Sequence, residues 1–304
     1  DNRRMTLPRY VKPGSTWMVT RRITQRQFLL KPTPLTNLIF AFCLALAALK
    51  TGVLIHAFCV MSNHWHAVVT DPKGRLPEFI EWVHKFVAKC MNAKLGRWEN
   101  LWSSDHCSAV LLTDPADILG KIIYVDGNPV SAELVASASQ WPGLISRPSD
   151  YTAGPVMIDR PDIFFRENGT VPRQVPLELV VPPAVRKMSP QEFRQLVERE
   201  LHTKENNVKR RLSREKRRVM GVRMILAQSE YDSPRTQARH RGLNPRLAAV
   251  DPWRRLETIR RLKSFIIAYR EALEQFKAGV HDVVFPPGTY WMKRFGGAAV
   301  GPPS

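Results

Sequence analysis

The sequence has few cysteines, and their placement excludes two common kinds of small, cross-linked domain. Its four cysteines, Cys43, Cys59, Cys90 and Cys107, form no C-x-x-C pair and stand among apolar residues. That usage argues against a disulfide framework and against a zinc knuckle, both of which need paired or closely spaced thiols. It is typical of reduced thiols buried in a cytosolic protein, so we expect a cytoplasmic location.

Hydrophobic runs are short as well. The apolar run LIFAFCLALAAL (residues 38–49) covers 12 residues and ends at Lys50. A membrane-spanning helix needs about 20 apolar residues, so this run favours a buried helix of a folded domain. It also lies too deep in the chain for a signal peptide. We therefore expect no interaction with a membrane.

Acidic side chains are outnumbered by basic ones. The chain has 46 Lys and Arg against 27 Asp and Glu, a net charge of +19 and a pI near 10.3. Residues 1–150 hold 17 basic and 11 acidic side chains, and residues 151–304 hold 29 and 16. A polyanion is the expected partner of such a chain, and nucleic acid is the commonest polyanion. The more basic second half suggests a region that grips DNA or RNA.

The first 150 residues alternate strand and helix patterns. We expect strands near 16–23, 52–61, 64–71 and 108–113, and helices near 34–50, 76–95 and 114–125. Asp114 is the expected N-cap of the last helix, followed by Pro115 in its first turn. This order predicts an α+β domain with a ferredoxin-like antiparallel sheet and helices on one face.

The rest of the chain divides into two regions. Residues 151–188 contain six prolines that interrupt regular elements, so we interpret them as a proline-rich linker. Residues 189–304 show helical patterns and form the basic helical region, in which Ser189 starts the first helix with a capping box. Residues 219–249 are a possible helix-turn-helix DNA reader, with a short second helix expected at residues 233–240.

The stretch FCVMSNHWHAVV places two histidines, His64 and His66, one residue apart on an expected strand. Alternate side chains of a strand point to the same face, so the two imidazoles project together, with Trp65 on the other face. Two neutral imidazoles side by side suit a metal ion. Taken alone, so short a pattern favours two ordinary histidines on a half-exposed strand, and the rest of the chain has to decide between the two interpretations.

A second pattern lies at the end of the helix that begins at Asp114. In YVDGNPV, Tyr124 precedes Asn128 by four residues, and residues at this spacing share a helix face. A cation can lower the barrier to attack by a tyrosine hydroxyl, and an amide oxygen can bind that cation. The alternatives are a packed helix tyrosine and an Asn-Pro pair that only ends the helix.

Together, MSNHWHAVVTD (residues 61–71) and YVDGNPVSAELV (residues 124–135) resemble the REP-associated tyrosine transposases, a branch of the single-tyrosine HUH transposases. The resemblance covers roughly residues 5–150. One departure is SAEL, where RAGL is common in the family, so one basic contact is missing.

The resemblance implies an HUH catalytic domain over residues 1–150. His64 and His66 match the metal ligands, Asn128 matches the third ligand, and Tyr124 matches the nucleophile. The implied cofactor is a divalent ion, Mg²⁺ or Mn²⁺. The implied reaction cleaves single-stranded, hairpin-forming DNA, leaves a 5′-phosphotyrosine and a free 3′-OH, and later rejoins a strand.

The same resemblance also implies a cellular location and an oligomeric state. We expect a prokaryotic, cytoplasmic protein, associated with the nucleoid when bound to DNA, as a monomer or a homodimer. Tyr124 would serve the metal site of its own chain or that of a partner.

A basic run over residues 204–218 holds eight Lys or Arg. It is either a solvated helix face or a surface that contacts DNA phosphates. The candidate DNA-binding residues within it are Lys209, Arg210, Arg211, Arg214, Lys216, Arg217 and Arg218.

Two rival functions fit the same residues. A domesticated protein of this fold would bind DNA without cleaving it. A metal-dependent nuclease would instead use the histidines to activate water, and Asp71 is the only carboxylate near the histidine motif that could assist it.

Overall fold

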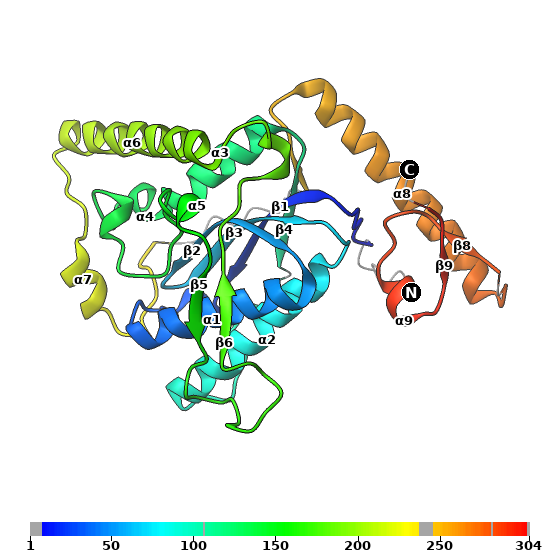
Figure 1. Cartoon of the computed structure of the whole chain (residues 1–304), viewed down its shortest axis with the longest axis horizontal. Coiled ribbons are helices and arrows are strands. Elements are labelled where there is room, and N and C mark those ends of the chain that lie inside the picture. The colour runs from blue at the N-terminus through cyan, green and yellow to red at the C-terminus, as the bar shows by residue number, and fades with distance from the viewer. Residues whose placement is uncertain (1–7, 106, 237–245, 281, 303–304) are drawn as a thin grey trace.

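The computed structural model describes residues 8–105, 107–236, 246–280 and 282–302, and its described part is an α+β protein, as expected (Figure 1). The helices are α1 (Pro34–Thr51), α2 (Leu76–Leu95), α3 (Pro115–Asp126), α4 (Asn128–Ser131), α5 (Asp150–Ala153), α6 (Pro190–Arg214), α7 (Val222–Ala227), α8 (Pro252–Lys277) and α9 (Trp291–Phe295). The strands are β1 (Ser15–Arg22), β2 (Leu54–Met61), β3 (His64–Asp71), β4 (Ser108–Leu112), β5 (Val156–Asp159), β6 (Gln174–Leu177), β7 (Leu247–Ala248), β8 (Val284–Phe285) and β9 (Ala299–Val300).

The central sheet has the strand order β2-β3-β1-β4-β7. The first four strands pair antiparallel, and their element order β1-α1-β2-β3-α2-β4 is the one that the sequence pattern predicts. Strand β7 was not expected. It comes from the second half of the chain and pairs parallel to β4 at the edge of the sheet.

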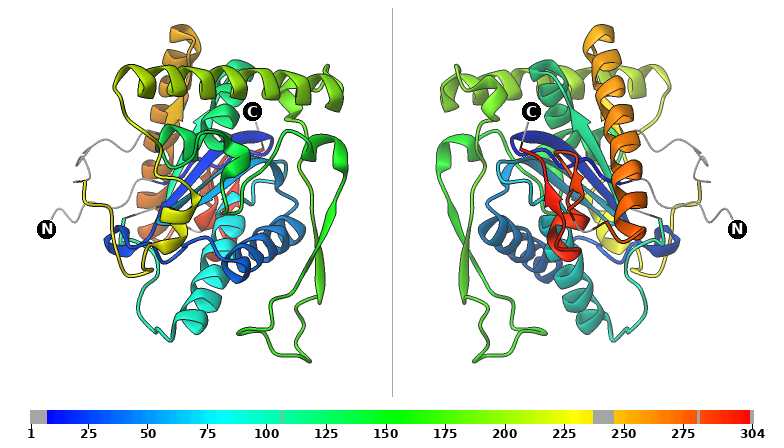
Figure 2. Two further views of the ribbon diagram at one scale, coloured as in Figure 1. Left: turned by 90° about the vertical axis from the view of Figure 1, so that its left-hand side faces the viewer. Right: turned by 90° about the vertical axis from the view of Figure 1, so that its right-hand side faces the viewer.

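Helices cover both faces of this sheet, which corrects the expectation that they lie on one face. Trp65 of β3 packs against Phe40 of α1 and His84 of α2, whereas its neighbour His66 contacts Tyr124 of α3. Adjacent strand residues point to opposite faces, so α3 lies across the sheet from α1 and α2 (Figure 2). Strands β2 and β3 are buried along nearly their whole length, as strands covered on both sides must be.

The start of α3 differs from the expected cap. Asp114 has the extended backbone of an N-cap, but its side chain makes no hydrogen bond to the helix. The carboxylate instead forms an ion pair with Arg254 of α8 and accepts a hydrogen bond from Thr113. One turn later, Asp117 accepts from the backbone N–H of Val250 at 2.9 Å. The two carboxylates therefore attach the second half of the chain to the start of α3.

Residues 151–188 contain regular structure that their prolines had argued against. Strands β5 and β6 pair as an antiparallel hairpin. Pro176 is tolerated in β6 because both strands of a two-stranded ladder are edge strands, where proline can be accommodated. The hairpin lies along α1, where Val175 is buried against Phe42 and Leu46 (Figure 2). Helix α1 is long and apolar enough to cross a membrane by length and composition, but most of it is buried inside the fold.

The basic helical region begins as predicted. Ser189 and Glu192 form the capping box of α6, which runs over α3 on the side of the sheet away from α1 and α2. Of the two helices expected for a helix-turn-helix in residues 219–249, the described residues contain one, the short helix α7. No helix covers residues 233–236, and the rest of the expected second helix lies outside the described residues. The long helix α8 also lies within residues 189–304, where the sequence shows helical patterns.

Candidate metal and nucleophile site

Strand β3 brings the two histidines together, as its alternation requires. The rings of His64 and His66 lie 4.8 Å apart between centroids, on the face that α3 covers. In the register of the sheet, His66 stands opposite Thr20 of β1 and Cys59 of β2. The pair therefore sits in the middle of the sheet, where neighbouring strands fix the backbone on both sides.

Each imidazole is held through its Nδ1 atom. His66 Nδ1 lies 2.7 Å from Thr20 Oγ1, and His64 Nδ1 lies 2.6 Å from Asn63 Oδ1. The Nε2 atom of His66 is buried and has no hydrogen-bond partner among the described residues. A buried nitrogen without a partner is costly. Histidines that bind metals are commonly oriented in this way, with one nitrogen held by the protein and the other free for the ion.

The protonation state of the pair also suits a metal ion. Burial, with a contribution from the charge of Arg22, lowers the pKa of His64 to about 4. Burial lowers the pKa of His66 well below its usual range, and neighbouring His64 lowers it further. Both rings are therefore neutral at pH 7, which is the form in which imidazole binds a metal.

Tyr124 lies beside the histidines on the last full turn of α3. Its ring is 5.5 Å from the ring of His66 and is 39% exposed, so it can reach both the pair and a molecule in solution. The tyrosine and the histidines of a single chain therefore meet. Two ammonium groups lie near the ring, those of Lys121 at 5.6 Å and Lys204 at 5.4 Å.

Asn128 reaches the site from a separate short helix. Helix α3 ends at Asp126, Gly127 joins it to α4, and Asn128 is the first residue of α4. The expectation of one continuous helix is therefore wrong, since the Asn-Pro pair starts a new turn. The backbone N–H of Gly127 still bonds to the Ile123 carbonyl at 3.0 Å. The Asn128 side chain is buried and interacts with His64, whose pKa it raises slightly against the larger effect of burial.

Asp71 does not belong to the site. It is fully buried, and its carboxylate accepts hydrogen bonds from the backbone N–H groups of Lys73, Arg75 and Leu76 ahead of α2. The side chain is thereby used to start that helix. Among the described residues, no group of three or more His, Cys, Asp or Glu could hold a metal ion, so a metal at the histidines would depend on the Asn128 amide.

Sequence reasoning missed three residues at the site. Thr20 and Asn63 hold the histidines, and alternation along the expected first strand could have suggested Thr20. Lys204, in α6, lies 80 positions after Tyr124, and no spacing rule connects them. Asp126, two residues after Tyr124, is also buried; burial raises its pKa to about 8, and Ser146 Oγ donates to it at 2.5 Å.

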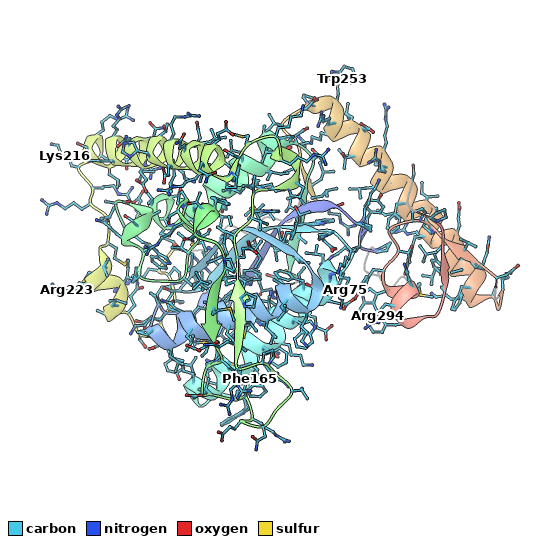
Figure 3. All side chains as sticks on the ribbon, in the orientation of Figure 1. Arg75, Phe165, Lys216, Arg223, Trp253 and Arg294 are labelled. Carbon is cyan, nitrogen blue, oxygen red and sulfur yellow. The ribbon has the colours of Figure 1, made fainter. Side chains whose placement is uncertain are left out.

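The structure separates the seven candidate DNA-binding residues into two that form ion pairs and five that form none among the described residues. Arg211 and Arg217 both form ion pairs with Glu133, so their charges are partly neutralised. The other five candidates make no ion pair among the described residues and are exposed; Lys216 lies just beyond the end of α6 (Figure 3). These five are Lys209, Arg210, Arg214, Lys216 and Arg218.

Comparisons with known proteins return no matching family model and no matching curated protein. A structure of a REP-associated tyrosine transposase bound to a REP hairpin matches 55% of this chain and 96% of its own, at 19% identity and a TM-score of 0.41. A Deinococcus radiodurans protein described as a transposase matches 38% of this chain and 93% of its own, at 15% identity and a TM-score of 0.29. The first structure carries the family name that the two sequence motifs suggest. At these TM-scores, the function has to be derived from the residues of the site.

Proposed function

We propose that this chain is a metal-dependent endonuclease and strand transferase that acts on single-stranded DNA through Tyr124. The observation that carries the proposal is the meeting of a half-exposed tyrosine with two neutral, oriented histidines, 5.5 Å from the nearer ring. Neither part alone would suggest this chemistry. We take the β1-α1-β2-β3-α2-β4 unit, together with α3, as a ferredoxin-like HUH catalytic domain.

The proposed metal ligands are His64, His66 and Asn128. The buried, unpartnered Nε2 of His66 fits this role, because a ligand bond would satisfy it. Imidazole and amide ligands accept Mn²⁺ or Mg²⁺. When bound, the ion supplies Lewis-acid polarisation of a phosphate oxygen and offsets charge in the transition state.

The remaining chemistry belongs to Tyr124. Its hydroxyl oxygen attacks the scissile phosphorus in line, a new O–P bond forms, and the P–O3′ bond breaks. The phenol proton leaves to solvent, and the departing 3′-oxygen gains a proton to become a 3′-OH. The strand stays attached as a 5′-phosphotyrosine. A later attack by a 3′-OH reverses these changes and joins a strand without an external energy source.

The proposed substrate is single-stranded DNA that folds into a hairpin, as the sequence resemblance implies. A net charge of +19 supports a polyanionic partner. We further propose that the protein acts as a transposase, moving DNA by cleavage and rejoining of single strands.

The test is a search for the covalent intermediate. Purified protein is incubated with labelled hairpin DNA that carries a single-stranded flank, with Mn²⁺ or Mg²⁺, and is resolved on a denaturing gel. We expect a shifted protein–DNA band for the wild type and none for Tyr124→Phe or His64→Ala. Tyr231→Phe is the matched control, because Tyr231 is also an exposed tyrosine and lies outside the site.

Two outcomes would contradict the proposal. Cleavage that persists in Tyr124→Phe, without a covalent band, would point to a hydrolase that activates water. Tight binding of the hairpin by wild type and Tyr124→Phe alike, with no cleavage over a panel of hairpins, would point to a binding protein of the same fold.

A further inference from the structure

A groove of about 490 Å³ lies between α3 and α6, beside the turn that carries Tyr124. One face of α6 forms most of its wall, and Ile123, the residue before Tyr124, closes the other side. The groove belongs to neither the histidine pair nor the buried core. Its main polar lining residues are Glu200, Thr203, Lys204, Asn207, Arg211 and Arg214.

Lys204 connects this groove to the nucleophile. Its ammonium lies 5.4 Å from the centre of the Tyr124 ring and donates a hydrogen bond to the Ile123 carbonyl at 3.2 Å. The aliphatic part of Lys204 passes over Gly127, where a Cβ atom would lie 2.7 Å from Lys204 Cδ. The lysine is therefore packed into place at the active site, unlike a surface lysine that moves freely in solvent.

Positive charge outweighs negative charge along the groove. Among the described residues that line the groove, Glu200 alone is acidic, and its carboxylate already lies 3.6 Å from Arg199. Arg211 is paired with Glu133 at 2.7 Å. Arg214 makes no ion pair within the described part of the chain. Lys204 and Arg214 are therefore the two lining cations that form no ion pair among the described residues, although the charge of Asp126 acts on Lys204 at longer range.

The spacing of the cations suits a chain of phosphates. Ten residues separate Lys204 from Arg214, which is about 15 Å along an α-helix. That length spans more than one phosphate of a DNA strand. A basic helix face that is only solvated would need neither a groove nor a lysine packed against the proposed nucleophile.

We propose that the α3–α6 groove binds the phosphate backbone of the DNA strand next to the bond that Tyr124 cleaves. Lys204 contacts the phosphate nearest the tyrosine, and Arg214 contacts one farther along the strand. This site is built by α6, which lies outside the motif-bearing first 150 residues. The inference rests on the proposed function for the identity of the nucleophile.

The test measures DNA binding apart from catalysis. A fluorescein-labelled single strand of mixed sequence is titrated with Tyr124→Phe protein in EDTA, at several salt concentrations. Lys204→Met and Arg214→Met are introduced into this background, since methionine keeps the aliphatic length and removes the charge. Lys263→Met, an exposed lysine of α8, is the matched control. Thermal melting of each variant checks that the fold is kept.

We expect the slope of log K against log salt to fall by about 0.7 for each of Lys204→Met and Arg214→Met. Lys263→Met should leave the slope unchanged, and Lys204→Arg should restore it. In the Tyr124-containing protein, Lys204→Met should also lower the yield of covalent adduct more than Arg214→Met does.

Two results would overturn the proposal that the groove binds DNA. One is an unchanged slope in both variants. The other is an equal loss in Lys209→Met, because Lys209 lies on the opposite side of α6 and a shared loss would mean diffuse attraction. Failure of the proposed function is recognised separately, since it appears as a missing adduct in the wild-type protein, whatever the binding slopes.

Discussion

At the scale of single residues, one of the two imidazoles, that of His66, depends on a hydrogen bond from outside the motif that contains it. Thr20 belongs to β1 and is held opposite His66 by the register of the sheet. For His66 to offer Nε2 to a metal ion, its Nδ1 atom must carry the proton and donate it to the threonine oxygen. The contact with Thr20 is compatible with that tautomer, because a threonine hydroxyl can accept as well as donate.

The first prediction concerns this contact. Thr20→Val keeps the shape of the side chain but removes the acceptor, so it should weaken Mn²⁺ binding by roughly 10-fold to 100-fold. Isothermal titration of the DNA-free protein with Mn²⁺ measures the effect. Thr258→Val, on α8, is the control. Unchanged affinity in Thr20→Val would mean that Thr20 does not orient the ligand.

The second prediction concerns His56, which is fully buried on β2. It lies 2.8 Å from the Val180 carbonyl and 2.7 Å from Thr70 Oγ1, and burial lowers its pKa to about 4. The unfolded chain takes up a proton near pH 6.5, and the folded chain does so only near pH 4. The contribution of neutral His56 to the free energy of unfolding is therefore retained above pH 6.5. It is lost as the pH falls from 6.5 to 4, by about 1.4 kcal/mol per pH unit.

His56→Gln should remove that dependence. Urea unfolding at several pH values would show a slope between pH 6.5 and 4 that is flatter than in the wild type by about the same amount. The comparison between the two proteins cancels the opposing effect of Asp126, whose raised pKa favours the folded state over this range. His202→Gln, at an exposed position, is the control. Equal slopes in wild type and His56→Gln would contradict the prediction.

At the scale of elements, the junction between α3 and α4 decides how the proposed nucleophile, Tyr124, and the proposed third ligand, Asn128, are placed. Gly127 allows the chain to end one helix and begin the next, and it leaves room for Lys204 of α6. A Cβ atom at this position would lie 2.9 Å from the Ile123 carbonyl oxygen and 2.7 Å from Lys204 Cδ. A methyl group there must displace the lysine, the turn or both.

The third prediction compares two glycines of the same segment. Gly127→Ala should lower the yield of covalent adduct about 10-fold or more, because an ångström of misplacement in an active site can cost on the order of 100-fold in rate. Gly120→Ala, inside α3, meets nothing within 4 Å and should raise stability by about 0.5–1 kcal/mol with the adduct unchanged. Adduct yield and melting temperature are measured for both. Equal yields in the two variants would show that the junction tolerates a side chain.

At the scale of the whole molecule, the second half of the chain completes the fold of the first. Helix α6 buries Phe193, Val197 and Leu201, and the Phe193 ring lies 4.9 Å from the ring of Tyr151. Farther along, the backbone N–H groups of Met220 and Gly221 bond to the carbonyls of Glu133 and Leu134. These contacts argue for a folding unit that is longer than the catalytic domain expected over residues 1–150.

The fourth prediction follows from those contacts. A fragment that ends at residue 188 loses three buried side chains, each contributing about 1.5–3 kcal/mol, and should melt non-cooperatively or not fold. A fragment that ends at residue 236 keeps them and should melt cooperatively. Calorimetry of the two fragments gives the answer, and cooperative melting of the shorter one would show that α6 is dispensable for the fold.

The sequence by itself determined the elements that carry the site. Alternation fixed β3 and put His64 and His66 on one face, and helical spacing with capping residues located α3 close to its observed bounds. The α+β class followed from the order of these elements. Such patterns are readable because they depend on neighbours two to four positions away.

Only the tertiary structure decided what surrounds these elements. Helices cover both faces of the sheet, Asp114 pairs with Arg254, and Lys204 lies beside Tyr124. Asp71 binds the backbone ahead of α2 instead of joining the site. Local sequence patterns do not determine these arrangements, because most of them depend on contacts between residues distant in the chain. A carboxylate next to a helix start can bond to the helix or to a distant arginine, and local pattern does not distinguish the two. The packing of α6 over α3 is likewise a contact between distant segments. It brings Lys204, 80 positions farther along the chain, to the proposed nucleophile Tyr124.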